Sequence, residues 1–149
     1  MFFINGFVKN IMVSEDLMED TFMEFMIHKH YFRGDSSLKT YLFKIARNKA
    51  LNYLKKNKYM LEIPENLEDK RQLEDHILKN EENKTLHMAM KRLNEDYFMV
   101  LYLLYFEKLS YNEIGKVMKK SEKQIKNLAY RARNSLKEIL IKEEFDYEK

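Results

Sequence analysis

The sequence contains no cysteine, one proline and only three glycines among its 149 residues. Without cysteine, the chain cannot form disulfides, thiolate zinc sites or a cysteine nucleophile. Tight turns and phosphate-binding loops depend on glycine and proline, so the scarcity of both disfavours sheet proteins and Gly-rich nucleotide sites. We therefore predict an all-α fold.

Long hydrophobic runs are also absent. The longest, residues 98–106, has nine residues and includes two tyrosines, whereas a membrane span needs about 18 or more. The N-terminal segment lacks the basic start, long apolar stretch and cleavage site of a secretory signal. We expect no membrane span and a cytoplasmic protein.

Positive charge is present but unevenly distributed. The formal net charge is +3, yet residues 29–58 contain nine Lys or Arg against one acid, and residues 119–137 contain seven against one. Two basic blocks in an otherwise acidic chain predict a polyanionic partner, because neutralised phosphates release counterions. The alternative is two helix faces that are simply solvated.

An acidic stretch after Pro64 divides the chain. Residues 65–87 carry few aromatic residues and no clear apolar stripe. We predict two small helical domains, residues 1–63 and 88–143, joined by a linker over 64–87 and followed by a tail over 144–149.

The first half reads as two helices. Ser14 is expected to cap the first, with acidic residues crowding its early turns, where the helix dipole favours negative charge. Apolar residues recur there at helical spacing: Leu17, Met18, Phe22, Phe25 and Met26. A second helix, residues 38–54, follows the turn at Gly34 and is expected to be apolar inside and basic outside. Exposed Tyr41 and Tyr53 beside that basic charge suit single-stranded nucleic acid, and core packing is the alternative for Tyr41.

The second half predicts a helix-turn-helix. Asn94 can cap one helix, and the patterns Ser110-x-x-Glu113 and Ser121-x-x-Gln124 can cap a short helix and a longer one. In such a motif the start of the second helix meets base edges and later residues extend that surface. The residues in question are Lys123, Gln124, Lys126 and Asn127, then Tyr130, Arg131 and Arg133. Gln and Asn can bind adenine, and Lys and Arg can bind guanine or phosphate. The alternative is a plain three-helix bundle.

Three segments together resemble the bacterial RNA polymerase sigma factors, especially the small extracytoplasmic-function group. They are residues 14–22 (SEDLMEDTF), residues 32–54 (FRGDSSLKTYLFKIARNKALNYL) and residues 109–133, from LSYNEI to AYRAR. Their order and separation match the family, and they cover most of both halves.

The resemblance implies a function for each half. The first would be a region 2-like domain that binds the promoter −10 element and the polymerase clamp, and the second a region 4-like domain that binds the −35 element. Clamp contacts would come from Asp16, Leu17, Glu19, Asp20, Phe22 and Met23. The −10 surface would comprise Tyr41, Lys44, Arg47, Asn48, Lys49 and Asn52. In the −35 domain, Lys126, Asn127, Tyr130, Arg131 and Arg133 would read DNA, with Tyr111 near the phosphates. An anti-sigma factor is a further partner that only the resemblance implies.

The chain departs from the family at three points. Only residues 1–12 precede the acidic helix, so we expect a shortened first helix; Tyr41 stands where Trp is frequent, and Asn112 replaces a frequent acid. No catalytic, metal or cofactor site is predicted, because His28 and His30 lack a third ligand and no carboxylates pair on an apolar background. The chain is therefore expected to be no enzyme. Two alternatives remain open: a stand-alone helix-turn-helix regulator, and a sigma-like interaction protein without initiation activity.

Overall fold

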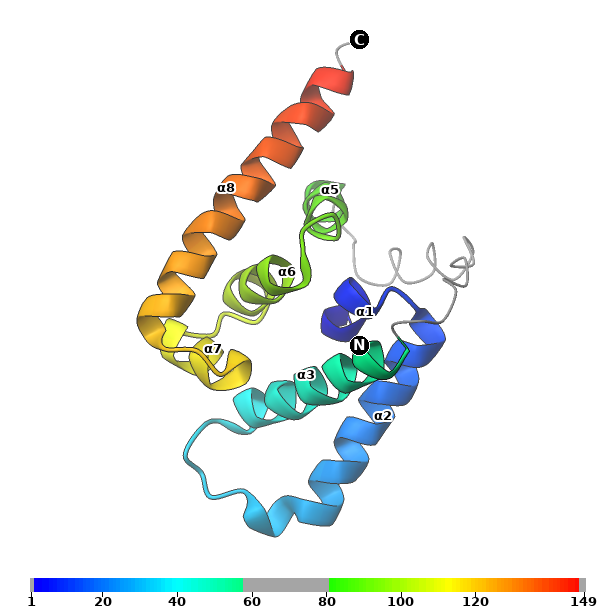
Figure 1. The fold of residues 1–149 in the computed structure, drawn as a ribbon, viewed down its shortest axis with the longest axis vertical. Helices are drawn as coiled ribbons and strands as arrows, with labels where there is room; N and C mark the ends of the chain where they lie inside the picture. The colour runs from blue at the N-terminus through cyan, green and yellow to red at the C-terminus, as the bar shows by residue number, and fades with distance from the viewer. Residues whose placement is uncertain (1, 58–80, 148–149) are drawn as a thin grey trace.

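The computed structural model describes residues 2–57 and 81–147, which form helices and short connections (Figure 1). No strand occurs within these ranges, so the predicted all-α fold is confirmed. The first domain contains α1 (Phe2–Val8), α2 (Ile11–His28), η1 (Lys29–Tyr31) and α3 (Leu38–Lys56). The second contains α5 (Glu81–Met90), α6 (Glu95–Leu101), the π-helix η2 (Tyr102–Phe106), α7 (Tyr111–Met118) and α8 (Glu122–Tyr147).

The predicted domain limits fall partly outside the described residues. Pro64 and residues 64–80 of the predicted linker lie outside them, whereas α5 crosses the limit set at residue 88 and α8 continues past residue 143. The limits at 63, 87 and 143 therefore stay predictions. None of the described helices is both long enough and apolar enough for a membrane span.

The cap of α2 differs from the prediction. Asn10, not Ser14, caps this helix, because its side-chain oxygen accepts a hydrogen bond from the Val13 amide at 3.1 Å. Ser14 is fully buried one turn later and donates to the Asn10 carbonyl at 2.7 Å. The acidic residues consequently lie beyond the first turn of the helix, where the dipole favours them less.

The apolar residues of α2 divide between the core and the surface. Ser14, Leu17 and Thr21 form the buried side of the helix. Phe22 and Met26, which share the helical spacing of Leu17, are 50% and 60% exposed. A periodic apolar pattern shows that residues share a side of a helix, but it does not show what covers them.

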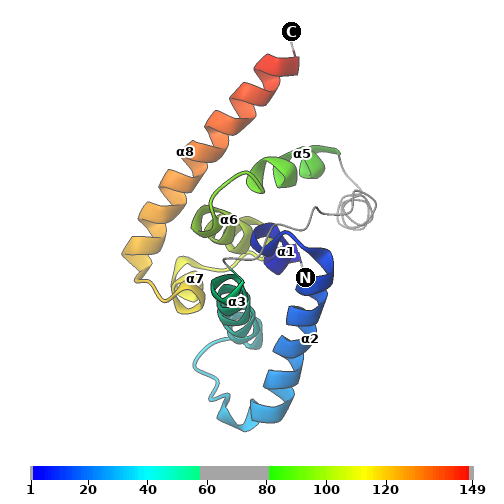
Figure 2. The ribbon, with the colours of Figure 1, turned by 45° about the vertical axis from the view of Figure 1, so that its right-hand side comes forward.

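Helix α1 is short and lies on the side of the first domain that faces the second in both ribbon views (Figures 1 and 2). Phe3, Ile4 and Phe7 are at most 5% exposed. The Phe3 ring lies 5.2 Å from Phe43 of α3 and 5.7 Å from Tyr102 of η2, measured between ring centroids. A single buried core therefore continues from the first domain into the second.

The second domain confirms the predicted helix-turn-helix and its caps. The side chains of Asn94, Ser110 and Ser121 each accept from the backbone amide three residues later, at 2.9–3.1 Å. Helices α7 and α8 follow as the short and the long helix. Their buried residues close a core with α6: Phe98, Leu101, Ile114, Val117, Ile125, Leu128, Ala129 and Ala132.

Lysines occupy turn positions where glycine is usual. Lys9, Lys108 and Lys119 adopt left-handed backbone angles, with φ of 54–58°, after α1, η2 and α7. The scarcity of glycine therefore does not mean that such turns are missing. In the helix-turn-helix the glycine is Gly115 instead, where an added Cβ would lie 2.5 Å from the carbonyl oxygen of Lys120.

Candidate nucleic-acid interface

Helix α8 presents a basic face opposite its buried side. Ser121 and Gln124 form a complete capping box, since the Gln124 Oε1 also accepts from the Ser121 amide at 2.9 Å. Six predicted DNA-contacting residues are exposed there: Lys123, Gln124, Lys126, Asn127, Tyr130 and Arg131. Because Gln124 uses its oxygen in the cap, it has only its amide donors for a base, and Asn127 is the freer amide.

The other two predicted residues, Tyr111 and Arg133, flank this face. Lys126 Nζ lies 5.8 Å from the centre of the Tyr111 ring and 3.6 Å from a Glu122 oxygen. Arg133 Nη1 donates to the Tyr105 hydroxyl at 3.4 Å. The hydrogen bonds that Arg133 donates to Tyr105 and then to Tyr111 raise the pKa of Arg133, and its guanidinium is a permanent cation at the edge of this face.

Tyr105 is a member of this group that the sequence did not reveal. Its position in an apolar run predicts a core residue, yet it is 49% exposed. The cause is η2, in which the Glu107 amide bonds to the Tyr102 carbonyl five residues earlier. A π-helix shifts the side chains out of the 3.6-residue period, so no periodicity argument would have placed Tyr105 at the surface.

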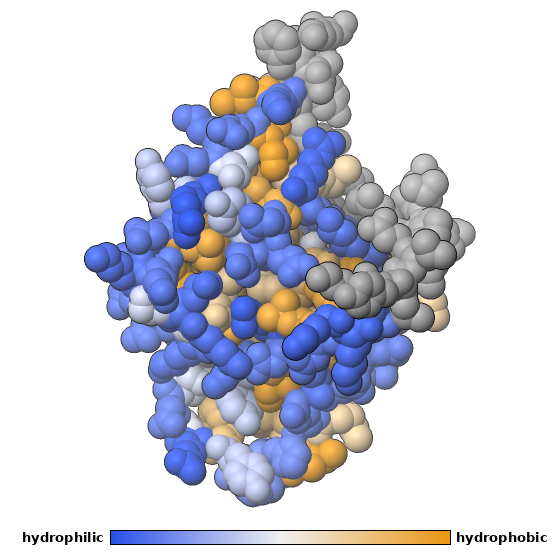
Figure 3. Space-filling model, viewed as in Figure 1, coloured by the Kyte–Doolittle hydropathy of each residue, from blue (hydrophilic) through white to orange (hydrophobic). Residues whose placement is uncertain are grey.

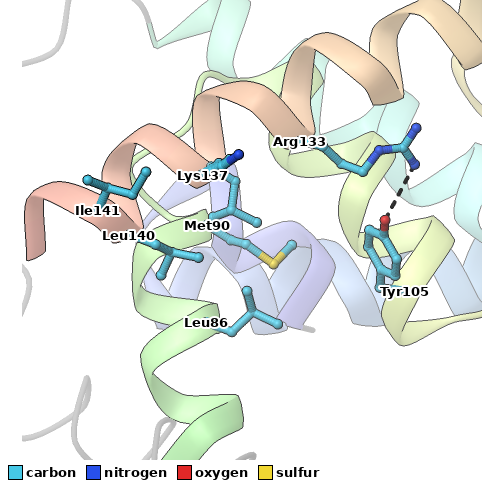
Figure 4. Close-up of a pocket in the computed structure, with 8 residues that line it drawn as sticks. Leu86, Met90, Tyr105, Arg133, Lys137, Leu140 and Ile141 are labelled. Carbon is cyan, nitrogen blue, oxygen red and sulfur yellow. Dashed lines mark hydrogen bonds between the residues drawn. The ribbon is translucent and has the colours of Figure 1, made fainter. Parts of the chain in front are cut away.

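An apolar groove of about 350 Å³ lies behind the basic face, between α5 and α8. Leu86 and Met90 line it from α5 and Leu140 and Ile141 from α8, with Arg133 and Lys137 along α8 (Figure 4). Hydrophobic atoms gather over the same two helices in the space-filling view (Figure 3). The arginine thus borders both the groove and the basic face of α8.

Helix α3 carries the second basic surface. Ser37 caps it, accepting from the Thr40 amide at 3.1 Å. Four predicted −10 residues recur at spacings of three and four, and so share one side of the helix: Tyr41, Lys44, Asn48 and Asn52. Lys44 and Asn52 are exposed, and Tyr41 and Asn48 are half-buried.

The aromatic residues on α3 are less exposed than predicted. The Tyr41 ring lies 5.1 Å from Phe32 and 6.1 Å from Phe25, so it forms the edge of an aromatic cluster. Tyr53 packs against the core. One ring edge at Tyr41, rather than two free rings, is thus available to an unpaired base.

The remaining two predicted −10 residues lie to the sides of this face. Lys49 Nζ is 3.2 Å from Glu24 of α2. Arg47 is half-buried; burial lowers its pKa, and the charge of Asp96 in α6 partly opposes this shift. Lys49 is therefore already paired within the protein, whereas the buried Nε of Arg47 has no hydrogen-bond partner among the described residues.

Helix α2 presents a mixed acidic and apolar surface. Of the residues predicted to contact polymerase, Asp16, Glu19, Asp20, Phe22 and Met23 are exposed. Leu17 is only 9% exposed and belongs to the core. Met26 and Ile27, both 60% exposed, extend the apolar part of this surface by another turn.

His28 and His30 are the two residues for which a metal site is considered and rejected from the sequence alone. Their ring centroids are 6.3 Å apart, and each packs near Tyr31. Within the described residues, no three His, Cys, Asp or Glu side chains come together in a way that could hold an ion.

Comparison with known proteins links both basic surfaces to one family. The family model "Sigma-70 region 2" matches residues 3–59, which include α1 to α3. The model "Sigma-70, region 4" matches residues 83–136, which include the helix-turn-helix.

Individual relatives agree over nearly the whole chain. The ECF RNA polymerase sigma factor SigM of Bacillus subtilis is 32% identical over 142 residues, covering 92% of this chain and 85% of its own. RNA polymerase sigma factor YlaC of the same organism is 30% identical, covering 87% and 78%. The fold is similar to that of the sigma factor RpoE from Bartonella quintana, solved in complex with the anti-sigma factor NepR, with a TM-score of 0.72, 22% identity and coverage of 93% and 87%. This chain therefore belongs to the extracytoplasmic-function (ECF) family of RNA polymerase sigma factors.

Proposed function

We propose that this sigma factor binds core RNA polymerase and directs initiation at promoters that carry −10 and −35 elements. The proposal rests on the presence of two separate basic helix faces, one on α3 and one on α8. Helix α2 adds a third surface, which is mixed acidic and apolar. A regulator that only binds duplex DNA needs one such basic face. Two faces with a third surface suit a protein that joins polymerase to two DNA sites.

The −35 element is assigned to α8. Lys126 and Asn127 lie exposed near the start of the helix, where side chains can enter the major groove. Tyr130 and Arg131 continue the same surface, and Tyr111 with Arg133 supplies phosphate contacts at its edge. Tyr105 joins the set as the residue that positions Arg133.

The −10 element is assigned to α3. Lys44 and Asn52 are exposed on the side shared with Tyr41 and Asn48. Cations there can follow the DNA backbone, while the ring edge of Tyr41 meets an unpaired base. Lys49 must leave Glu24 before it contacts DNA, and Arg47, which is half-buried, must become more exposed.

Core polymerase is assigned to α2. Its acids Asp16, Glu19 and Asp20 surround the exposed Phe22 and Met23. Exposed apolar residues rimmed by charge are typical of protein-binding surfaces. Leu17 supports this surface from the core rather than contacting the partner directly.

Further parts of the proposal concern organisation and partners. The two functional domains are residues 1–63 and 88–143, and the chain acts in the cytoplasm without catalytic chemistry of its own, as an initiation factor for the polymerase. An anti-sigma factor is proposed as a second protein partner, since the structurally similar RpoE was solved with one.

Charge reversal on α2 tests whether polymerase binding and DNA binding depend on different surfaces of the protein. Asp16→Lys with Glu19→Lys should abolish capture of core polymerase in a pull-down, because both acids leave the docking surface. The same variant should bind a duplex selected for binding to the wild-type chain with unchanged affinity. The matched control, Glu95→Lys with Glu138→Lys, changes exposed acids by the same net charge and should leave capture intact.

Two outcomes of this experiment would overturn the assignment. Undiminished capture by the α2 variant would remove α2 as the docking surface. Duplex binding by a wild-type chain that never captures polymerase would favour a stand-alone helix-turn-helix regulator instead.

A further inference from the structure

The apolar groove between α5 and α8 is open to solvent along one side. Leu86 and Met90 form its α5 wall, and Leu136, Leu140 and Ile141 belong to its α8 wall. Figure 4 shows the two α5 side chains opposite α8. Ile141 is 53% exposed at the edge of the groove. Exposed apolar residues gathered in a groove are typical of a surface that another molecule covers.

Cations accompany the apolar residues on the α8 wall. Arg133 and Lys137 precede Leu140 and Ile141 at spacings of three, four and seven, and so lie on the same side of the helix. Lys137 is exposed and forms no ion pair among the described residues. A complementary partner is therefore apolar where it meets Leu140 and acidic where it meets Lys137.

The end of α8 has this composition. The helix continues to Tyr147, and Figure 1 shows its last turns extending beyond α5. Glu144 follows Leu140 by four positions and Ile141 by three, so it occupies a position on the same side of the helix. Because α8 is one continuous helix, its end runs away from the groove of its own chain. The end of α8 in a second copy can enter that groove.

Two copies of α8 are complementary when they run antiparallel. With the pairing centred between Leu140 and Ile141, each of these residues lies opposite the other in the second copy, and Lys137 lies opposite Glu144. A two-fold axis repeats every contact, so the pair gains two apolar and two opposite-charge contacts. A parallel pairing in register would instead place Lys137 against Lys137 and Glu144 against Glu144, which like-charge repulsion disfavours.

We propose that this chain forms an antiparallel dimer in which the end of α8 of each copy lies in the groove between α5 and α8 of the other. Residues 133–147 form a helix of roughly 22 Å, which covers less than the about 800 Å² per partner of a standard interface, so the dimer is weak. The starts of the two helices lie about 55 Å apart at opposite ends, which leaves Lys126 and Asn127 free. The dimer does not depend on the proposed function.

Sedimentation equilibrium of the full chain, from micromolar to submillimolar concentration, tests the dimer. The wild-type chain should change from monomer to dimer over this range. Ile141→Glu should raise the dissociation constant at least about tenfold, because it places a carboxylate at the apolar centre of the pairing. The matched control is Met12→Glu on α2, which changes another exposed apolar residue to the same acid and should leave the dissociation constant unchanged.

A charge exchange tests the antiparallel pairing itself. Lys137→Glu and Glu144→Lys should each weaken the dimer, more so at low salt, because each variant places like charges in both contacts. An equimolar mixture of the two single variants should dimerise again, since every Glu then meets a Lys of the other chain. Lys142→Glu makes the same charge change on the opposite side of α8 and should leave the dimer unaffected.

Several outcomes would overturn the dimer. A chain that stays monomeric at every concentration would refute it, as would a dimer that resists both Ile141→Glu and Lys137→Glu while these variants keep their helical circular dichroism. If Ile141→Glu unfolds the protein, failure of the mixed single variants to dimerise would still refute the pairing. A monomeric chain in which Ile141→Glu lowers capture of core polymerase would assign the groove to polymerase instead. Failure to capture polymerase bears only on the proposed function.

Discussion

The two domains differ in how completely they bury their apolar side chains. In the second, Phe98, Ile114 and Ile125 are 0% exposed and belong to a core shared by three helices. In the first, α2 leaves Met23 and Met26 about 60% exposed. A helix that keeps large apolar residues in water adds little stability through them. The helix-turn-helix is therefore stabilised by its part of the shared core, whereas α2 of the first domain also presents an apolar surface that a partner can cover.

The largest difference in the free energy of unfolding is expected between matched truncations in the two domains. Ile125→Ala removes a fully buried side chain and should lower the free energy of unfolding by about 2–5 kcal/mol. Met23→Ala removes an exposed one and should change it by about 0.5 kcal/mol or less. Urea denaturation followed by circular dichroism measures both. If both variants lowered the free energy of unfolding by similar amounts, the proposed difference in burial between the two domains would be wrong.

Acid should weaken the second domain through His87. This imidazole is 1% exposed between the rings of Phe98 and Phe106, and its Nδ1 has no hydrogen-bond partner among the described residues. Burial, and then the charge of Lys91, lowers the pKa of His87 to about 4 from its ordinary 6.5.

The sign of the effect follows from which state binds the proton. Between pH 6.5 and 4 the unfolded chain is protonated at His87 and the folded chain is not, so stability is complete above pH 6.5 and falls as the pH drops toward 4. The expected loss is about 3 kcal/mol. Urea denaturation at pH 7.5 and 4.5 measures it. His87→Leu should abolish most of this loss, whereas His30→Gln in the first domain should retain it; the reverse pattern would refute the assignment.

The smallest effects are expected at the left-handed lysines. Lys119→Gly after α7 and Lys9→Gly after α1 should each raise the free energy of unfolding by about 1 kcal/mol, since glycine relieves a φ near 57°. Lys120 does not have a positive φ, so Lys120→Gly is the control and should not raise the free energy of unfolding. A stabilisation by Lys120→Gly equal to that by Lys119→Gly would show that loss of charge, not backbone strain, is responsible.

Local signals in the sequence predicted the second domain well. Asn94, Ser110 and Ser121 cap helices as expected, because a cap depends only on residues within one turn. The basic face of α8 followed from the apolar residues opposite it. For the same reason the helix-turn-helix, and the exposure of Lys126 and Asn127, could be placed without knowledge of the rest of the chain.

The errors have two causes, competing local signals and contacts between distant residues. Ser14 has the chemistry of a cap, but Asn10 starts the helix earlier and Ser14 is buried. The spacing of Phe22 and Leu17 places them in one apolar pattern, yet Leu17 is buried and Phe22 is 50% exposed. Tyr105 follows a π-helix register, and the approach of Gly6 to Phe98 joins residues 92 positions apart in sequence. Periodicity contains no information on such packing between elements.

Run-off transcription with core polymerase and a library of randomised promoters tests the central claim most directly. The account predicts transcripts with defined 5′ ends only when this chain is present, and loss of those transcripts when either selected element is scrambled. Binding of the chain to duplex DNA and to polymerase without any such transcript would contradict it.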